Sequence, residues 1–500
     1  MTLVEGLDSA MNELHDLELL VRSRVAIVVI QTQAERRAMD LLVRLGIGMA
    51  VPVFRWTVTE GLARVDIETP AQRFNRAAGE VLGHIRSSSQ GGLYVLLDIH
   101  PWLDDPVNVR LLKDIALRQE QTGQTLVLLS HALSVPPELA AYAAQFEMRL
   151  PDRRRLAEIV RAAARDWSER NPGRRVRTDE ATFAELVRNL SGLTEDDARR
   201  LAHRVIFDDG AITEHDMPQV METKFSLLNR EGVLFFEYDT ADFSEVGGLQ
   251  GLKRWLEQRR APFLEADQAK QLGPPKGVLL LGVQGGGKSL AARAVAGMWG
   301  VPLLRLDFGA LYNKFHGETE RNLRESLEAA RLMAPCVLWI DEIEKGIGGD
   351  SHDGGTSRRV LGTLLTWMAG NRSKVFIVAT ANDIAALPPE LIRKGRLDEI
   401  FFVDLPDLDT RKEVFAIHLR KRGQEPGGFD LDCLAASAEG FSGSEIEQAV
   451  VSALYALDTG ALSDQHVLAE LRRTRPLSVV MAEHLHSLRT WAAGRTVPAA

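Results

Sequence analysis

Short runs of apolar residues recur along the chain and are separated by polar or glycine-containing segments. The clearest runs lie at residues 25–30, 278–281, 337–340 and 375–379. Continuous apolar runs of this length are typical of strands that are buried on both faces of a parallel sheet. Residues 290–298 are rich in alanine and are compatible with a helix. The pattern predicts an α/β fold with parallel strands.

A glycine-rich segment follows the apolar run at 278–281. It reads Gly-Val-Gln-Gly-Gly-Gly-Lys-Ser, which is the phosphate-loop pattern G-x-x-x-x-G-K-S. Its glycines let backbone N–H groups turn toward phosphate oxygens, and the next helix adds the positive end of its dipole. We expect Lys288 to bridge the β- and γ-phosphates and Ser289 to ligate Mg²⁺. The predicted nucleotide-binding residues of this segment are Gly282, Val283, Gln284, Gly285, Gly286, Gly287, Lys288, Ser289 and Leu290.

Two further apolar runs lead into polar side chains. Asp341 and Glu342 follow the run at 337–340. We expect Asp341 to hold the water shell of Mg²⁺ and Glu342 to orient and polarise the attacking water. Asn382 ends the next strand, and we expect it beside the γ-phosphate because carboxyl ends of parallel strands face the ligand crevice. A plain strand followed by surface acids is the alternative, and the occurrence of both motifs in order disfavours it.

An arginine downstream is a candidate for acting on a neighbouring subunit. Residues 391–398 read Leu-Ile-Arg-Lys-Gly-Arg-Leu-Asp, and Arg396 is the candidate. An arginine that reaches another subunit's γ-phosphate is worth about 10³–10⁵ in kcat in other NTPases. A solvated surface arginine is the alternative interpretation.

The length, charge and cysteine count of the chain exclude several classes of protein. With 500 residues, 45% hydrophobic and 26% charged, the chain is long enough for two to four packed domains. A net charge of −9, from 60 basic and 69 acidic residues, argues against nucleic acid as a partner. No apolar run reaches the roughly 18 residues of a membrane span, and early acidic residues exclude a signal peptide. Two cysteines, Cys336 and Cys433, exclude a disulfide framework and favour a cytoplasmic location.

Five motifs in order resemble those of AAA-type ATPases of the AAA+ superfamily, over residues 242 to about 493. They are residues 243–249, residues 274–277 before the phosphate loop, residues 314–320, residues 334–344 and residues 440–443. The resemblance implies ATP and Mg²⁺ as cofactors. It also implies a large P-loop NTPase domain at residues 236–406 and a small helical lid domain with a C-terminal helix at residues 407–500.

The same resemblance implies roles for individual residues. Val246 and Gly247 would lie on the adenine side, and Phe315 and His316 would form a pore loop whose aromatic ring grips substrate. Arg396 would act on the nucleotide of the next subunit in a homo-oligomeric ring, expected to be a hexamer. The apolar spacing of residues 476–493 predicts a helix that caps the lid.

A narrower resemblance is to the AAA ATPases known as conserved plastid and cyanobacterial reading frames. Gln284 stands where most AAA members have proline, and residues 356–367 and 393–406 are similar to that family. One position departs from many AAA members, because Glu399 stands where a second trans-acting arginine would be. We therefore expect weaker coupling between neighbouring subunits.

Short segments of the first half resemble segments of the second half that lie 243 to 255 residues further along the chain. The matched segments are 94–98 with 338–341, 136–139 with 388–391, 150–152 with 405–407, 191–192 with 442–443, and 209–213 with 459–463. Their common order predicts an internal duplication. We expect a degenerate AAA-like α/β domain at residues 1–150 and a helical lid-like segment at 151–235. Two unrelated α/β domains that share turn chemistry are the alternative.

The first half lacks the residues of the phosphate site. Residues 31–37 contain no glycine and no lysine, and Asp98 is followed by Ile99 instead of a glutamate. We interpret this half as a domain that packs, recruits or regulates. The twelve histidines are scattered, and the sequence predicts no metal cluster.

Three functions compete at this point. The leading one is a ring-forming ATPase that remodels an unidentified protein substrate. A nucleotide-gated scaffold with slow turnover is the second, and Glu399 favours it slightly. A nucleic-acid motor or loader is the third. The acidic balance and the aromatic pore residue disfavour it, and the arginine clusters at residues 153–155 and 174–177 favour it weakly.

Overall fold

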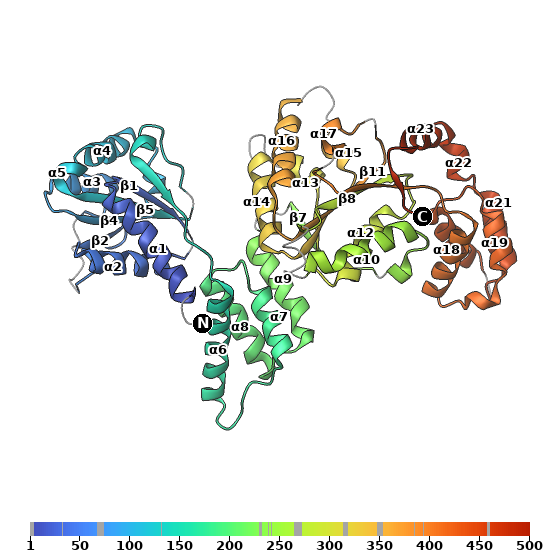
Figure 1. Ribbon diagram of the computed structural model, residues 1–500, viewed down its shortest axis with the longest axis horizontal. Coiled ribbons are helices and arrows are strands. Elements are labelled where there is room, and N and C mark those ends of the chain that lie inside the picture. Colours follow the sequence, from blue (N-terminus) through green and yellow to red (C-terminus); the bar gives the residue numbers. More distant parts are fainter. Residues whose placement is uncertain are drawn as a thin grey trace. The chain divides into compact units, whose positions relative to one another are not determined.

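A computed structural model of the chain describes residues 5–32, 34–67, 75–131, 133–229, 233–238, 240–241, 243–264, 273–313, 319–347, 354–384, 386–393, 395–457 and 461–500. The chain divides into two compact units, residues 1–220 and residues 221–500 (Figure 1). Each unit contains its own sheet, and each is described by itself.

The first unit is built on a six-stranded sheet with the order β3-β2-β4-β5-β1-β6. The strands are β1 (Ile27–Gln31), β2 (Val53–Thr57), β3 (Gly61–Arg64), β4 (Gly92–Leu97), β5 (Gln124–Ser130) and β6 (Ala143–Phe146). All neighbours pair in parallel except β2 and β3, which are antiparallel. The helices of this domain are α1 (Glu5–Arg22), α2 (Glu35–Met49), α3 (Ala78–Ser87), α4 (Pro106–Leu117) and α5 (Gln119–Thr122).

Both faces of this sheet are covered. Along β4, Leu93, Val95 and Leu97 join a buried cluster with α2, whereas Tyr94 and Leu96 join a cluster with α3 and α4. Side chains alternate between the faces of a strand, so burial on both faces requires a continuous apolar run. This explains why β1 could be recognised in the sequence as the apolar run at residues 25–30.

Helices follow the sheet in the first unit. They are α6 (Arg153–Arg170), α7 (Glu180–Asn189), α8 (Glu195–Asp209) and α9 (Met217–Leu228), the last of which crosses the boundary between the units. Asp152 caps α6 by accepting a hydrogen bond from the backbone of Arg155, and Thr194 caps α8 in the same way through Asp197. Such caps define the helix starts that face the cavity described below.

The second unit is built on a seven-stranded sheet with the order β13-β12-β8-β11-β10-β9-β7. Its strands are β7 (Leu234–Glu237), β8 (Gly277–Gly282), β9 (Leu303–Leu306), β10 (Cys336–Ile340), β11 (Val375–Ala381), β12 (Glu399–Val403) and β13 (Val497–Pro498). The helices of this domain are α10 (Gln250–Leu264), α12 (Lys288–Trp299), α13 (Phe308–Asn313), α14 (Thr319–Leu332), α15 (Ile343–Ile347), α16 (Gly354–Gly370) and α17 (Pro389–Ile392). Figure 1 shows α14 and α16 on one face of the sheet and α10 and α12 on the other.

The two sheets share one topology. Strands β2, β4, β5, β1 and β6 follow the same order in the first sheet as β9, β10, β11, β8 and β12 in the second. Each sheet also carries an antiparallel strand at the same edge, β3 beside β2 and β7 beside β9. The predicted α/β class is confirmed, and the shared order supports the internal duplication over two unrelated domains.

A helical bundle follows β12 in the second unit. It is formed by α18 (Leu408–Lys421), α19 (Leu431–Ser437), α20 (Gly443–Tyr455) and α21 (Asp464–Arg473). Two further helices, α22 (Leu477–Val480) and α23 (Ala482–Ala492), come after it. The lid-capping prediction for the last helix needs correction, because Leu488 and Trp491 pack with the sheet's cluster and not with the bundle core. An ion pair between Arg489 and Asp404 (2.8 Å) also fixes this helix to the segment after β12. Among the described residues, no helix is long and apolar enough to cross a membrane.

The close approach of β8 to β12 gives a test of the fold. A Cβ atom added at Gly282 would lie 2.0 Å from the backbone oxygen of Val403, which a strand cannot easily move. We expect Gly282→Ala to lower the free energy of unfolding of the second unit by about 1–3 kcal/mol. The matched control is Gly362→Ala in α16, where nothing lies within 4 Å of the new atom. Equal calorimetric unfolding midpoints for both variants would contradict this packing.

Candidate functional site

A cavity of the second unit lies at the carboxyl ends of its parallel strands. It has a volume of 380 Å³ and is bounded by the loop after β8, by the ends of β10 and β11, and by α18 and α20. In open α/β sheets this edge is where ligands bind. The predicted residues that line it are Val246, Gly247, Gln284, Gly285, Gly286, Gly287, Lys288, Ser289, Leu290, Asp341, Glu342 and Asn382.

The loop between β8 and α12 has the conformation that its glycines predict. Gly285 and Gly287 adopt φ values of +75° and +91°, which side-chain-bearing residues rarely take. A Cβ atom at Gly285 would lie 2.2 Å from the hydroxyl oxygen of Ser444 at the start of α20. The glycine is therefore required both for the turn and for the close approach of the helical bundle to the loop.

Lys288 lies inside this loop and is 6% exposed. Its ammonium group donates hydrogen bonds to the backbone oxygens of Gly282 (2.9 Å) and Val283 (2.7 Å). Burial lowers the pKa of Lys288 to about 8, although the acidic side chains of the site oppose the shift. The charged form of Lys288 therefore has few partners in the loop until an anion binds.

A carboxylate and two hydroxyls form the oxygen-rich part of the site. Asp341 Oδ1 accepts a hydrogen bond from Thr380 Oγ1 (2.6 Å) and one from Ser289 Oγ (3.2 Å). Hydroxyl and carboxylate oxygens are the ligands that Mg²⁺ prefers. Ser289 and Asp341, the residues predicted to hold the metal, therefore lie in contact.

Glu342 and Asn382 also meet at this edge. The amide group of Asn382 donates a hydrogen bond to Glu342 Oε1 (2.9 Å), and the backbone N–H of Glu342 donates to Thr380 Oγ1 (2.9 Å). Glu342 has a φ of +47°, a conformation that is sparsely populated outside glycine and that concentrates at functional sites. Beside them, burial raises the pKa of Glu344, whose Oε1 accepts a hydrogen bond from the backbone of Asn382 (2.9 Å).

Three predicted residues that the structure describes, Gly282, Val283 and Arg396, do not line the cavity. Arg396 does not line the cavity of its own chain, and its guanidinium group donates to the backbone oxygen of Glu390. Phe315 and His316, the predicted pore loop, lie outside the described residues.

The sequence analysis missed the contribution of the helical bundle. Val414, Ile417 and His418 of α18, together with Ser444 and Glu447 of α20, line the cavity opposite the phosphate loop. The start of α20 carries a capping box between Ser442 and Glu445, which is visible in the sequence as S-x-x-E. That signal predicts a helix start, but only the tertiary structure brings it to Gly285.

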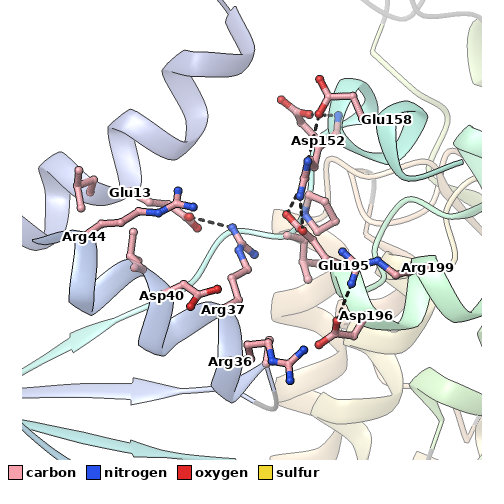
Figure 2. A pocket seen from close by; sticks show the side chains of 16 residues that line it. Glu13, Arg36, Arg37, Asp40, Arg44, Asp152, Glu158, Glu195, Asp196 and Arg199 are labelled. Atoms are coloured by element: carbon pink, nitrogen blue, oxygen red, sulfur yellow. Dashed lines mark hydrogen bonds and ion pairs between the residues drawn. The ribbon is translucent and has the colours of Figure 1, made fainter. Parts of the chain in front are cut away.

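The first unit has a cavity at the corresponding place, and its lining is different (Figure 2). This cavity of 660 Å³ lies between the first turns of α2, the start of α6 and the start of α8. Among its described lining residues there is no glycine and no lysine, and five arginines face six carboxylates. Arg36, Arg37, Arg44, Arg155 and Arg199 are the arginines; Glu13, Asp40, Asp152, Glu158, Glu195 and Asp196 are the acids.

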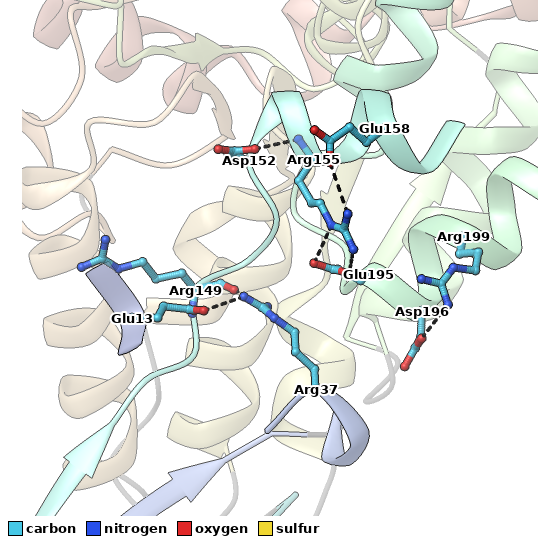
Figure 3. Close-up of polar contacts among 9 residues, drawn as sticks. All are labelled: Glu13, Arg37, Arg149, Asp152, Arg155, Glu158, Glu195, Asp196 and Arg199. Atoms are coloured by element: carbon cyan, nitrogen blue, oxygen red, sulfur yellow. Dashed lines mark hydrogen bonds and ion pairs between the residues drawn. The ribbon is translucent and has the colours of Figure 1, made fainter. Parts of the chain in front are cut away.

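Several of these charges neutralise one another (Figure 3). Arg155 of α6 binds Glu195 of α8 with two hydrogen bonds of 3.0 and 2.9 Å, a bidentate geometry that gives strong pairs. Arg37 pairs with the buried Glu13 at 2.8 Å and also donates to the backbone oxygen of Arg149. Long paired side chains therefore line the first unit's cavity where the second unit has a glycine loop.

Comparison with known families divides the chain in a similar way. Residues 278–405 match the family described as ATPase family associated with various cellular activities (AAA). Residues 13–148 match the N-terminal domain of SpoVK-like AAA ATPases, and residues 154–231 match the second domain of those proteins.

Full-length relatives agree with these matches. The chain is 33% identical over 491 residues to the AAA domain-containing protein ycf46 of Pyropia yezoensis, covering 96% of this chain and 98% of that protein. It is 32% identical over 496 residues to ycf46 of Guillardia theta, covering 96% and 95%. A proteasome-activating nucleotidase of Sulfurisphaera tokodaii is 38% identical over 229 residues, which are 44% of this chain and 58% of that protein. The resemblance inferred from the motifs is confirmed.

The lowered pKa of Lys288 predicts a pH effect on ligand binding. At pH 9 a lysine with a pKa of about 8 is mostly neutral, whereas phosphate groups favour its charged form. ATP binding at pH 9 should therefore take up close to one proton, and at pH 7 much less. Calorimetry in buffers of different ionisation enthalpy measures this number. Lys288→Arg is the control, because arginine stays charged; uptake that does not rise from pH 7 to pH 9 would contradict the prediction.

Proposed function

The chain belongs to the AAA ATPase family that includes the ycf46 proteins, and from this premise we propose that it hydrolyses ATP with Mg²⁺. The observation that carries the proposal is the convergence of Lys288, Ser289, Asp341, Glu342 and Asn382 on one cavity. A cation for the phosphates, oxygen ligands for Mg²⁺ and a carboxylate for water are the parts that phosphoryl transfer requires.

Each residue has a distinct task in this proposal. Lys288 exchanges its two carbonyl partners for the β- and γ-phosphates. Ser289 and the water shell held by Asp341 bind Mg²⁺, which neutralises charge that develops on the transferring group. Glu342 orients and polarises the attacking water, while Asn382 fixes the carboxylate and faces the γ-phosphate.

The opposite wall of the cavity suits a nucleobase. Val246 and Gly247 come from the segment before α10, and Val414 and Ile417 supply apolar surface from α18. His418 lies beside them with a pKa lowered by burial, which favours the neutral imidazole. Because α18 belongs to the helical bundle, nucleotide binding would couple the position of the bundle to the sheet.

We propose further that the active form is a homo-oligomeric ring, with a hexamer as the expected size. Arg396 supports this proposal, because its guanidinium group is held at the backbone of Glu390 and does not line its own cavity. An arginine in that place can act on the nucleotide of a neighbour, where it stabilises charge in the transition state.

The proposed substrate is a protein, with Phe315 and His316 gripping it in the central channel. One partial relative is named for activating a proteasome, which fits action on proteins. The net charge of −9 disfavours nucleic acid. The alternative is an ATP-gated scaffold with slow turnover, which the absence of a second arginine at Glu399 favours. ATP hydrolysis that is stimulated by unfolded protein would support the motor. ATP hydrolysis that is stimulated by neither unfolded protein nor DNA would support the scaffold.

Two substitutions separate binding from hydrolysis. Lys288→Ala should abolish ATP binding, because the phosphates lose their main cation in the loop. Glu342→Gln should bind ATP with Mg²⁺ and hydrolyse it at least about 10²-fold more slowly, because only the activation of water is lost. Calorimetry and phosphate release measure the two effects. Turnover of Glu342→Gln at the wild-type rate would refute the assignment.

A mixing experiment tests whether sites are shared between subunits. Arg396→Ala should keep ATP affinity within a few-fold and reduce kcat by about 10³ or more. When inactive Arg396→Ala is mixed with inactive Lys288→Ala, an intact cavity can lie beside an intact arginine, so part of the activity should return. Mixtures that stay inactive under assembling conditions would refute the shared site. The same holds if a proven monomer has full specific activity.

A further inference from the structure

A cluster of metal-binding side chains lies in the first unit, outside the cavities described above. Asp98, His100 and His131 each offer a ligand atom, and these atoms lie within 4.8 Å of one another. Asp98 directly follows β4, and His131 directly follows β5. Because β4 and β5 pair in parallel, the cluster lies at the carboxyl edge of the first sheet. This is the edge at which ligands bind in open α/β folds.

The cluster corresponds to the proposed metal position of the second unit. Ser130 Oγ donates a hydrogen bond to Asp98 Oδ1 (3.1 Å), as Thr380 Oγ1 does to Asp341 Oδ1 (2.6 Å). In both units the carboxylate directly follows one strand, and the hydroxyl lies within one residue of the end of its parallel neighbour. The first unit thus keeps the carboxylate and adds two imidazoles around it.

Ser130 also determines which nitrogen of His100 is available. Its hydroxyl has one proton, which is donated to the acceptor-only carboxylate of Asp98. Toward His100 Nδ1, at 2.8 Å, the same oxygen can only accept, so Nδ1 carries the proton and Nε2 carries the lone pair. A hydrogen bond of this kind orients metal-binding histidines and fixes their tautomer. Ser130 itself is 3% exposed, so its position is fixed by the fold.

The remaining geometry requires only small side-chain movements. His131 Nδ1 lies 4.0 Å from Asp98 Oδ1, against about 3.3 Å between two ligands of a tetrahedral zinc ion. The side chains of His131 and Asp98 are 58% and 61% exposed, so they can rotate without disturbing the core. The two imidazole rings stand perpendicular, with centroids 5.1 Å apart. The backbone of Asp98 has a φ of +51°, a rare conformation for a residue with a side chain.

We propose that Asp98, His100 and His131 form a binding site for a divalent transition-metal ion of the zinc class. Two imidazoles and one carboxylate suit Zn²⁺, Co²⁺ or Fe²⁺, whereas Mg²⁺ and Ca²⁺ take oxygen ligands. Three protein ligands leave at least one coordination position open for water or for a side chain of a partner. The site is separate from the proposed ATP site and does not depend on it.

The test uses the untagged full-length chain with millimolar Mg²⁺, which occupies oxygen-rich sites. Titration with Zn²⁺ should give one saturable site per chain, and Co²⁺ should give visible d–d absorption bands. His131→Ala and His100→Ala should each weaken binding at least about tenfold, because each removes one of three ligands. The double variant should bind no Zn²⁺ at that site. Ser130→Ala should weaken binding by about 10–100-fold through loss of the hydrogen bond that orients His100.

The matched control is His215→Ala, which removes an exposed histidine of the same unit and should bind Zn²⁺ like the wild type. Circular dichroism without metal verifies that the variants fold, and His131→Gln replaces His131→Ala if the latter does not. Zn²⁺ should also raise the unfolding midpoint of the wild type and not that of the double variant. Undiminished Zn²⁺ binding by the double variant, or the absence of saturable binding by the wild type, overturns the proposal.

Discussion

A hydrogen bond between the ends of two neighbouring parallel strands underlies the arrangement of the second unit's site. Asp341 directly follows β10, Thr380 lies near the end of β11, and their side chains are 2.6 Å apart. Thr380 also receives the backbone N–H of Glu342, so one hydroxyl fixes both acidic residues. Ser289 reaches the same carboxylate from α12, and Asn382 reaches Glu342 from the end of β11. The strand order makes this possible, because β11 lies between β8 and β10.

The first unit has the same kind of hydrogen bond between the ends of two parallel strands, but different side chains surround it. Asp98 and Ser130 repeat the carboxylate–hydroxyl pair on β4 and β5. The loop from β1 to α2, however, leads into Arg36 and Arg37, whose side chains line the first unit's cavity where the second unit's cavity is lined by glycines. Pairs such as Arg155 with Glu195 then hold the starts of α6 and α8 together. Residues 31–37 contain no glycine, so backbone N–H groups there cannot turn inward to surround a phosphate as they can in a glycine loop.

Much of the fold could be predicted from the sequence, because strands buried on both faces require continuous apolar runs. The phosphate loop could be predicted as well, since its glycines and lysine are adjacent in the chain. The wall formed by Val414, Ile417 and Ser444 could not, because it depends on how the helical bundle meets the sheet. The cluster of Asp98, His100 and His131 was missed for a related reason: its ligands come from two strand ends that only the parallel pairing of β4 and β5 brings together.

These observations explain how two sheets with the same topology can have different side chains at their carboxyl edges. The apolar clusters on the faces of each sheet fix the strand order and register, and they bury residues such as Val95 and Leu338 completely. At the carboxyl edge of the first sheet, the exposed side chains of Asp98 and His131 contribute little to that packing. Substitutions there cost little stability, because surface positions away from the core tolerate change. The carboxyl edge can therefore have a phosphate loop in one unit and ion pairs and imidazoles in the other, while both sheets keep the same strand order.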